Sequence, residues 1–193
     1  MNPDAQLVLD FWFGAPGSPT HRSPRDEWFR KDAAFDALIA QRFGAHIDLA
    51  LSDGLWRWKP PSPDALALIV VLDQFTRNTS RDTSRAFAGD AMALSAATDM
   101  VAMKLDEALL PVQRLFVYLP YEHSELLEVQ DESVHLFTKL VVTAPKLASL
   151  LDYAHRHRSV IARFGRFPHR NAALGRHSTA AELAFLQEPG SRF

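Results

Sequence analysis

The chain has 193 residues, 47% of them hydrophobic, a formal net charge of −2 and no cysteine. This length and composition suffice for a sizeable core, so we predict a single domain over residues 1–193. The near-neutral charge argues against a polyanion-binding protein, and the lack of cysteine excludes disulfides and thiolate chemistry.

Membrane insertion and export are not expected from the apolar pattern. The longest apolar run, Ala65–Leu72, has eight residues, whereas a membrane-spanning helix needs about 20. The first residues, MNPDAQLVLDFWFG, hold acids where a secretory leader would have lysine or arginine. We therefore predict a cytoplasmic protein.

The first half of the chain begins with two helices that have clear start and stop signals. Asn2 followed by Pro3 is a cap with proline at the first helical position, and Gly14 ends that short helix. Asp32 can cap a second helix with apolar residues at every fourth position, which stops before Gly54.

The next segment, Asp64–Phe75, is the one ambiguous element. Its apolar run, ALALIVVL, is compatible with a buried strand or a buried helix. The start signal Ser62-Pro63-Asp64 favours a helix, alanine and leucine lead the run, and no second strand candidate exists for pairing. We predict a buried helix over Asp64–Phe75, with the polar residues up to Arg81 at the point where the chain leaves the core in a loop.

The rest of the chain continues the helical pattern. Apolar stripes at helical spacing predict helices over roughly 87–105, 111–119, 126–141 and 145–164. Thr179 with Glu182 makes a capping box before a short closing helix. The sequence therefore predicts an all-α fold of seven to eight helices, with antiparallel helical hairpins as the packing.

A basic segment, His155–His177, holds six arginines, four histidines and no carboxylate. Gly165 should end the preceding helix, so Arg166–Arg170 is expected to be a loop, and Asn171 to cap a short turn ending at Gly175. The charges could be neutralised by an external anion held by guanidinium groups, or by the acidic segment Tyr121–Glu132. Internal pairing is favoured, and the two interpretations are compatible.

Candidate acid/base groups follow Pro120, where we expect the helix to break. Glu122 and His123 would then lie in the first turn of the acidic helix, where the helix dipole stabilises a carboxylate. They are the best acid/base candidates in the chain. His157, on an apolar face, is interpreted as a core residue with a satisfied ring nitrogen.

Cofactor and metal motifs are missing from the sequence. Glu132-x-x-His135 imitates the ligand pair of di-iron helical bundles, but no second pair accompanies it. No phosphate loop, dinucleotide fingerprint, nucleophile elbow or zinc-protease helix occurs. We expect no metal and no cofactor, and no nucleic-acid binding, because the basic segment is short and interleaved with core residues.

Three segments resemble a bacterial family known as domain of unknown function 924. They are LDQFTRNTSRDTSRAFAGD, YLPYEHSE and HRSVIARFGRFPHRNAALGRHST, and the likeness extends over essentially the whole chain. The resemblance implies a fold similar to the tetratricopeptide-like superfamily, a right-handed helical array, and no established activity. The chain departs from the family pattern at Thr76, where proline is usual, and at Asp82, where glycine is usual.

The predicted ligand-binding site unites the polar positions of these three segments. They are Asp73, Gln74, Arg77, Asn78, Arg81, Glu122, His123, Arg166, His169, Arg170 and Asn171. Our leading hypothesis is a pocket for a small anionic metabolite or peptide, with the arginines binding the anion. The alternatives are a hydrolase or lyase that uses Glu122, His123 or His169, and a purely structural polar network without a ligand.

Overall fold

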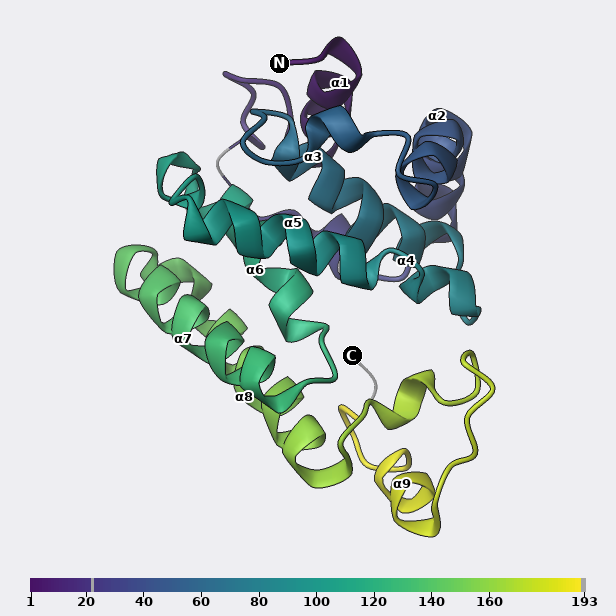
Figure 1. Cartoon of the computed structure of the whole chain (residues 1–193). Helices are drawn as coiled ribbons and strands as arrows, with labels where there is room; N and C mark the ends of the chain where they lie inside the picture. Colours follow the sequence, from purple (N-terminus) through teal and green to yellow (C-terminus); the bar gives the residue numbers. More distant parts are fainter. Residues whose placement is uncertain (22, 192–193) are drawn as a thin grey trace. The chain divides into compact units, whose positions relative to one another are not determined.

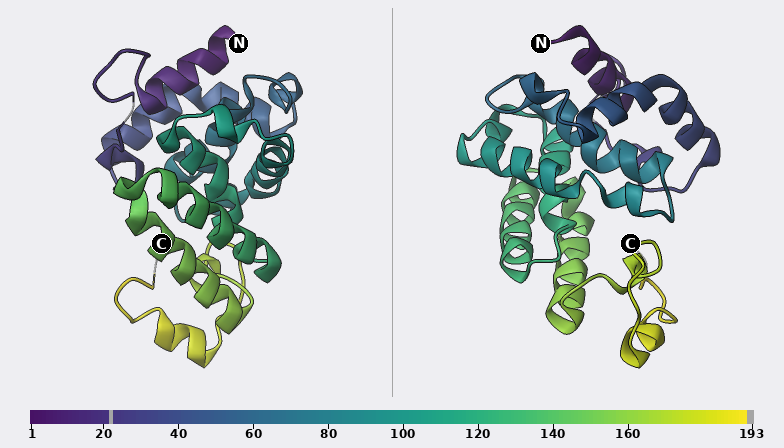
Figure 2. Two further views of the ribbon diagram at one scale, coloured as in Figure 1. Left: turned by 90° about the vertical axis from the view of Figure 1, so that its left-hand side faces the viewer. Right: turned by 45° about the vertical axis from the view of Figure 1, so that its right-hand side comes forward.

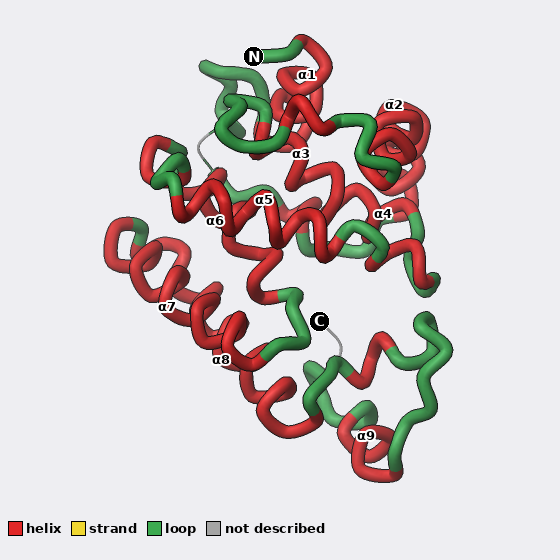
Figure 3. The backbone as a smooth tube through the Cα atoms, viewed as in Figure 1, coloured by secondary structure: helices red, strands yellow, loops and turns green. Residues whose placement is uncertain are grey.

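The computed structural model describes residues 1–21 and 23–191, and within them it contains helices, turns and loops but no strand (Figures 1 and 3). The prediction of an all-α fold is therefore confirmed. Eight helical stretches are present in this described part, if α3, a π-helical segment and α4 are taken as the one continuous run that they form.

The contacts of the chain divide it into two compact units, which are described in turn. Unit 1 comprises Met1–Arg81 and Arg85–Pro120, and unit 2 comprises Asp82–Ser84 and Tyr121–Phe193. The single domain predicted over residues 1–193 stays a prediction.

Unit 1 holds the first six labelled helices (Figure 1). They are α1 (Pro3–Phe13), α2 (Ala33–Leu51), α3 (Ala65–Ile69), α4 (Thr76–Thr79), α5 (Asp90–Ala102) and most of α6 (Pro111–Glu122). Both predicted caps are present. The Asn2 side chain accepts a hydrogen bond from the Asp4 N–H, and Asp32 accepts from the N–H groups of Ala34 and Phe35.

The ambiguous apolar segment is helical, as predicted, but it does not end in a loop. The run starts as α3, continues as a π-helix over Val70–Phe75 and ends as α4 at Thr79. The predicted helix over Asp64–Phe75 is thus confirmed, and the loop expected after Phe75 is wrong as far as Thr79. The apolar residues of α3 are buried and contact α1 and α5, which explains the lack of a polar face.

Aromatic rings form the centre of the unit 1 core. The Trp12 ring lies 5.5 Å from the rings of Phe75 and Phe116, both in edge-on orientations. Trp28 lies 4.8 Å from Phe116. These contacts connect α1, the π-helix and α6, so the π-helical segment is anchored in the core on its apolar side.

Helix α6 corrects the expected break at Pro120. The helix runs through this proline and ends at Glu122, while the acidic helix α7 begins only at Leu127. Proline removes one helical N–H, but the buried side chains around it, including Phe116 and Leu119, hold the helix together. Glu122 and His123 therefore lie at the end of α6, and not in the first turn of α7.

Unit 2 is built on a helical hairpin. Helices α7 (Leu127–Thr143) and α8 (Ala148–Phe164) follow each other along the chain through a short 3₁₀ turn and pack side by side (Figure 2). Gly165 ends α8 in the left-handed conformation with φ of 67°, as the sequence predicted. The expected antiparallel pairing is thus present in this pair of helices.

The C-terminal part of unit 2 folds onto α8 through a small apolar core. A 3₁₀ turn (Pro168–Arg170) and helix α9 (Ala180–Phe185) follow α8. Thr179 and Glu182 form the predicted capping box of α9. The core unites Val160, Ile161, Phe167 and Phe185, with Phe164 packed against it.

No helix in the described part of the chain has both the length and the apolar character that a membrane span needs.

Candidate functional site

The predicted site residues of unit 1 bind three aspartates in two groups, which together we call the aspartate network. Asp73, on the π-helix, is fully buried. Its Oδ1 accepts a hydrogen bond from Arg77 Nη1 at 3.0 Å, and its Oδ2 accepts from Gln74 Nε2 at 2.5 Å. Arg77 also donates to Asp90 on α5, at 3.0 Å. One guanidinium thus joins two carboxylates.

The remaining residues of this network bind the third aspartate. Asp36 on α2 accepts hydrogen bonds from Asn78 Nδ2 at 2.7 Å, from Arg81 Nε at 2.6 Å and from Arg81 Nη2 at 3.0 Å. The two bonds from Arg81 are parallel and bidentate. The network therefore ties α4 to α2, and no pattern in the sequence indicated Asp36 or Asp90 as partners.

The π-helix that carries Asp73 depends on a close contact with a glycine. The Leu72 carbonyl accepts a hydrogen bond from the Thr76 hydroxyl at 2.7 Å. Gly89 packs against the same carbonyl, and a Cβ on Gly89 would lie 2.2 Å from its oxygen. The missing side chain of Gly89 thus allows α5 to approach the π-helix. Single π-helical turns are frequent at functional sites.

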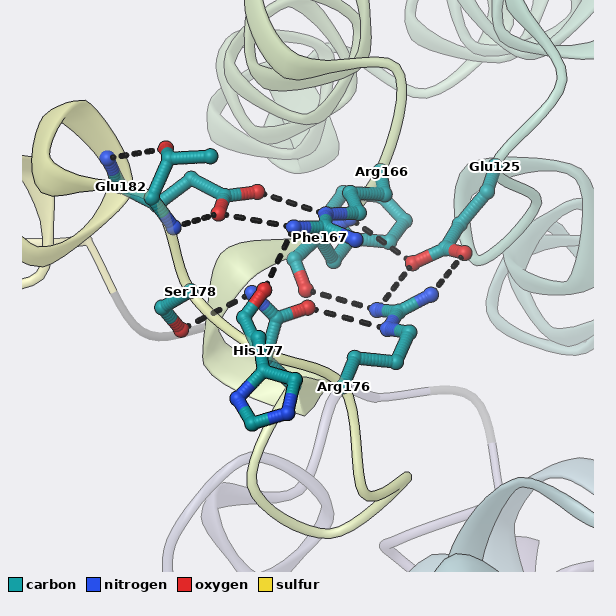
Figure 4. Close-up of polar contacts among 9 residues, drawn as sticks. Glu125, Arg166, Phe167, Arg176, His177, Ser178 and Glu182 are labelled. Atoms are coloured by element: carbon teal, nitrogen blue, oxygen red, sulfur yellow. Dashed lines mark hydrogen bonds and ion pairs between the residues drawn. The ribbon is translucent and has the colours of Figure 1, made fainter.

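In unit 2, two arginines of the basic segment are neutralised by glutamates (Figure 4). Arg176 binds Glu125 through two hydrogen bonds of 2.7 and 2.9 Å, and the Phe167 N–H donates to the same carboxylate. Burial raises the pKa of Glu125, but the hydrogen bonds from Arg176 and Phe167 outweigh it and lower the pKa overall.

The second pair of this kind joins Arg166 to Glu182. Arg166 donates two hydrogen bonds to the Glu182 carboxylate, at 2.6 and 2.9 Å, and one to the His177 carbonyl (Figure 4). The hydrogen bond from Arg166 lowers the pKa of Glu182 to about 2, with help from the Thr179 N–H. Arg166 is thus held by a carboxylate of α9.

Asn171 has a different role from the predicted one. Its Oδ1 accepts from Arg176 Nε at 2.9 Å, and its Nδ2 donates to the Ser178 hydroxyl at 3.0 Å. These bonds orient Arg176 and fix the returning chain, so the side chain does not cap the turn that ends at Gly175. The sequence predicted ion pairs between the basic and acidic segments. Two such pairs, Glu125–Arg176 and Asp131–Arg158, are present.

The other predicted residues of unit 2 lie beside His157 or the ring of Phe167 and form what we call the histidine cluster. It contains Glu122 and His123 from the end of α6, His157 from α8, and His169 and Arg170 from the 3₁₀ turn. The His157 and His169 rings lie 5.5 and 5.6 Å from the Phe167 ring. The Arg170 guanidinium stacks over it at 4.5 Å.

His157 and Glu122 form the buried centre of this cluster. Their exposed fractions are 5% and 4%, and Glu122 Oε1 lies 3.1 Å from His157 Nδ1. The same nitrogen lies 2.9 Å from the Tyr153 carbonyl, which can only accept, so Nδ1 carries the proton. The core position predicted for His157 is confirmed.

The charge state of His157 follows from its surroundings. Burial lowers its pKa to about 3, and the positive charges of His123, His169 and Arg170 act in the same direction, against the Tyr153 hydrogen bond. His157 is therefore neutral near pH 7, whereas His123 and His169 are only half-buried. The cluster thus brings three imidazoles, one guanidinium and the Glu122 carboxylate together around His157 and Phe167.

The structure distributes the predicted site residues over both units. Glu122, His123, His169 and Arg170 come together in the histidine cluster, Arg166 and Asn171 belong to the arginine–glutamate pairs of unit 2, and the other predicted residues belong to the aspartate network of unit 1. In the described ranges 1–21 and 23–191, no three histidine, aspartate or glutamate side chains are placed to hold a metal ion.

These features define an all-helical protein with internally neutralised arginines and a protonatable cluster in one unit. The chain belongs to the DUF924 family, described as bacterial protein of unknown function, and the match to that family covers residues 8–190. It is similar to the solved structure of ATU0120, a protein of unknown function from Agrobacterium tumefaciens. The two chains are 34% identical, with 95% of this chain and 96% of that chain covered and a TM-score of 0.80. No curated protein matches the chain.

Proposed function

We propose that the protein binds a small anionic ligand at the histidine cluster of unit 2. The observation that carries this proposal is the convergence of three imidazoles and one guanidinium from three segments around His157 and Phe167, with the Glu122 carboxylate beside His157. An anion beside His123, His169 and Arg170 could accept hydrogen bonds from their ring and guanidinium N–H groups.

The ligand class follows from the donors of the cluster. Imidazolium and guanidinium groups donate charge-assisted hydrogen bonds, which suit phosphate and carboxylate oxygens. We therefore propose a phosphorylated or carboxylated metabolite, or the carboxylate of a short peptide.

For the other predicted site residues we propose a structural role. Arg77, Arg81 and Arg166 each donate to a carboxylate of their own unit at 3.0 Å or less. A ligand anion would have to compete with these aspartates and glutamates. The proposed binding site is therefore narrower than the set of residues that the sequence suggested.

The test is a thermal-shift and calorimetric titration of the whole chain with inorganic phosphate and with citrate. A ligand at 100 times its dissociation constant should stabilise the protein by about 2.7 kcal/mol. The variant His169→Gln should weaken binding by about tenfold, because it removes one charge-assisted hydrogen bond worth about 1.5 kcal/mol.

The matched control is Arg158→Gln. Arg158 is next to His157 in sequence but pairs with Asp131 on the exposed side of the hairpin. Arg158→Gln removes one positive charge from α8, the helix that carries His157. It should leave phosphate affinity unchanged at constant salt. Equal weakening in both variants would indicate a nonspecific charge effect, and the absence of any stabilisation by either anion would refute the proposal.

A second candidate function is acid/base catalysis on an anionic substrate, as a hydrolase or lyase. The observation that favours it is the buried contact of 3.1 Å between Glu122 and His157, since a carboxylate that orients an imidazole recurs in acid/base sites. His123 or His169 would then exchange protons with the substrate. Turnover of a bound ligand that is lost in Glu122→Gln, with binding retained, would support catalysis over binding alone.

We also propose that the helices form a right-handed array of the tetratricopeptide-like kind. The α7–α8 hairpin supports this idea, because such arrays are built from antiparallel helix pairs. Proteins with this fold bind peptides along concave faces, which is an analogy at the level of the fold.

A further inference from the structure

A buried glutamine of α7 holds the part of the chain that carries Glu122 and His123. Helix α6 ends at Glu122, so its last carbonyls lack helical N–H partners. Gln130 is fully buried, and its Nε2 donates to the carbonyl oxygens of Glu122 and Ser124, both at 2.7 Å. The Tyr121 carbonyl lies farther away, at 3.5 Å.

The two accepting carbonyls lie on either side of His123. One amide group therefore holds the peptide unit before His123 and the peptide unit after Ser124, and the turn between α6 and α7 cannot rotate there without breaking a buried hydrogen bond. The side chain of Glu122 leaves the same backbone and contacts His157. Gln130 thus acts on two members of the histidine cluster without contacting either side chain.

We propose that Gln130 is the positioning residue of the histidine cluster. It orients His123 toward the ligand and holds Glu122 against His157 Nδ1. The role of His123 in ligand binding rests on the function proposed above, whereas the position of Glu122 relative to His157 can be measured without any ligand.

The chemistry of the site fits an amide better than the alternatives. An amide nitrogen has two hydrogens for two carbonyl oxygens, while a carboxylate would only accept and would face both oxygens. The Oε1 of Gln130 and the Oγ of Ser133, on the same face of α7, are buried and have no hydrogen-bond partner within the described ranges. A leucine at position 130 would fill the space without leaving a buried oxygen unpaired. The contribution of the glutamine is therefore its two hydrogen bonds to the carbonyl oxygens.

The test compares Gln130→Met with Ser133→Ala in the full chain. Methionine keeps the length and burial of the side chain but removes both donors, whereas Ser133→Ala removes a polar atom that is equally buried and does not touch the turn. The first measurement is made without ligand, by nitrogen-15 NMR of the imidazole rings. We expect the His123 and His157 signals to shift in Gln130→Met and to stay unchanged in Ser133→Ala.

A purely structural role of Gln130 would lower stability without moving these two rings relative to the other histidines. Unchanged His123 and His157 signals in a folded Gln130→Met protein would therefore overturn the proposal. If methionine prevents folding, Gln130→Asn provides the second variant, because it keeps the amide and shortens it by one methylene. It should shift the same two signals, and no other imidazoles, if the proposal is correct.

The second measurement is the titration with inorganic phosphate. We expect Gln130→Met to weaken phosphate binding by about tenfold, the effect of losing one well-oriented hydrogen-bond donor, here His123. Ser133→Ala should leave phosphate binding unchanged. If phosphate does not bind the wild-type protein, the proposed function fails while the NMR result still decides the role of Gln130. If phosphate binds and Gln130→Met shifts the rings without weakening binding, His123 does not contribute to the ligand site.

Discussion

Gly89 is the residue at which a single added methyl group should be most costly. Its Cβ would lie 2.2 Å from the Leu72 oxygen, which belongs to rigid backbone in the π-helix. Gly89→Ala should therefore destabilise the protein by about 1–3 kcal/mol, the usual cost of overpacking, or more. The measurement is the urea midpoint of unfolding.

Gly44→Ala is the matched control for that substitution. Gly44 lies in the middle of α2, and a methyl group added there would meet nothing within 4 Å. Alanine has the better helix propensity, so this variant should gain about 0.5–1 kcal/mol. A loss of stability in Gly44→Ala similar to that in Gly89→Ala would contradict the steric explanation.

Glu182 should make stability depend on pH in the acid range. Its pKa is about 2 in the folded chain and 4.5 for the free side chain. The unfolded chain binds the proton more readily, so the contribution of Glu182 is present above pH 4.5 and is lost as the pH falls toward 2. Glu182→Gln should be less stable than the wild type near neutral pH, and the difference should shrink on acidification.

That difference is measured by urea unfolding of both proteins at several acid pH values. Glu188 offers a control on the same C-terminal segment, because it is exposed and the structure gives its side chain no cation partner in the described residues. Glu188→Gln should change stability little at any pH. A pH-independent difference between wild type and Glu182→Gln would show that packing, and not ionisation, is what the substitution removes.

At the scale of elements, most features that act within one helical turn were predicted correctly, with the cap at Asn171 as an exception. Features that depend on distant contacts were not. The caps at Asn2, Asp32 and Thr179, and the glycine at Gly165, were read from the sequence because each acts within one turn of its own helix. The continuation of α6 through Pro120 and the π-helix could not be predicted, because both depend on residues packed around them from other segments.

The same distinction explains which contacts of the candidate site were predicted from the sequence and which were not. Charge complementarity between the basic and acidic segments predicted pairing in general, and Glu125 with Arg176 is an example. The partner of Arg166 was missed because Glu182 already had a role in the capping box, and a carboxylate can accept from a backbone N–H and a guanidinium together. Which acid pairs with which base depends on the fold, since the side chains are chemically equivalent.

The hydrogen bonds that Asp36 of α2 accepts from α4 and the residues after it give a prediction at the scale of elements. Asp36 accepts three hydrogen bonds from Asn78 and Arg81, and its side chain is 14% exposed. Asp36→Asn should cost about 2 kcal/mol, because the charge-assisted bonds of a partly buried guanidinium are lost. Chemical denaturation measures the change in the free energy of unfolding.

Asp48→Asn is the control on the same helix. Asp48 pairs with Arg85, but both side chains are at least half exposed, and exposed ion pairs contribute only about 0–1 kcal/mol. High salt should reduce the effect of Asp48→Asn further and leave most of the Asp36→Asn effect in place. Equal effects of the two substitutions would mean that α2 and α4 are not held together by Asp36.

At the scale of the whole molecule, the two units should unfold together. The chain passes from one unit to the other at Arg81, returns at Arg85 and passes again at Pro120, inside the continuous helix α6. The helix that supplies Phe116 to the core of unit 1 thus ends in unit 2. We therefore predict one cooperative transition, consistent with the single domain expected from the sequence.

The distribution of natural probes makes this prediction testable without labels. All four tryptophans, Trp12, Trp28, Trp56 and Trp58, belong to unit 1, whereas His157 is buried in unit 2. Tryptophan fluorescence and the NMR signal of His157 should give the same urea midpoint and the same slope. Two separated midpoints would mean that each unit is a folding domain of its own, and that the histidine cluster can unfold while the aromatic core of unit 1 remains intact.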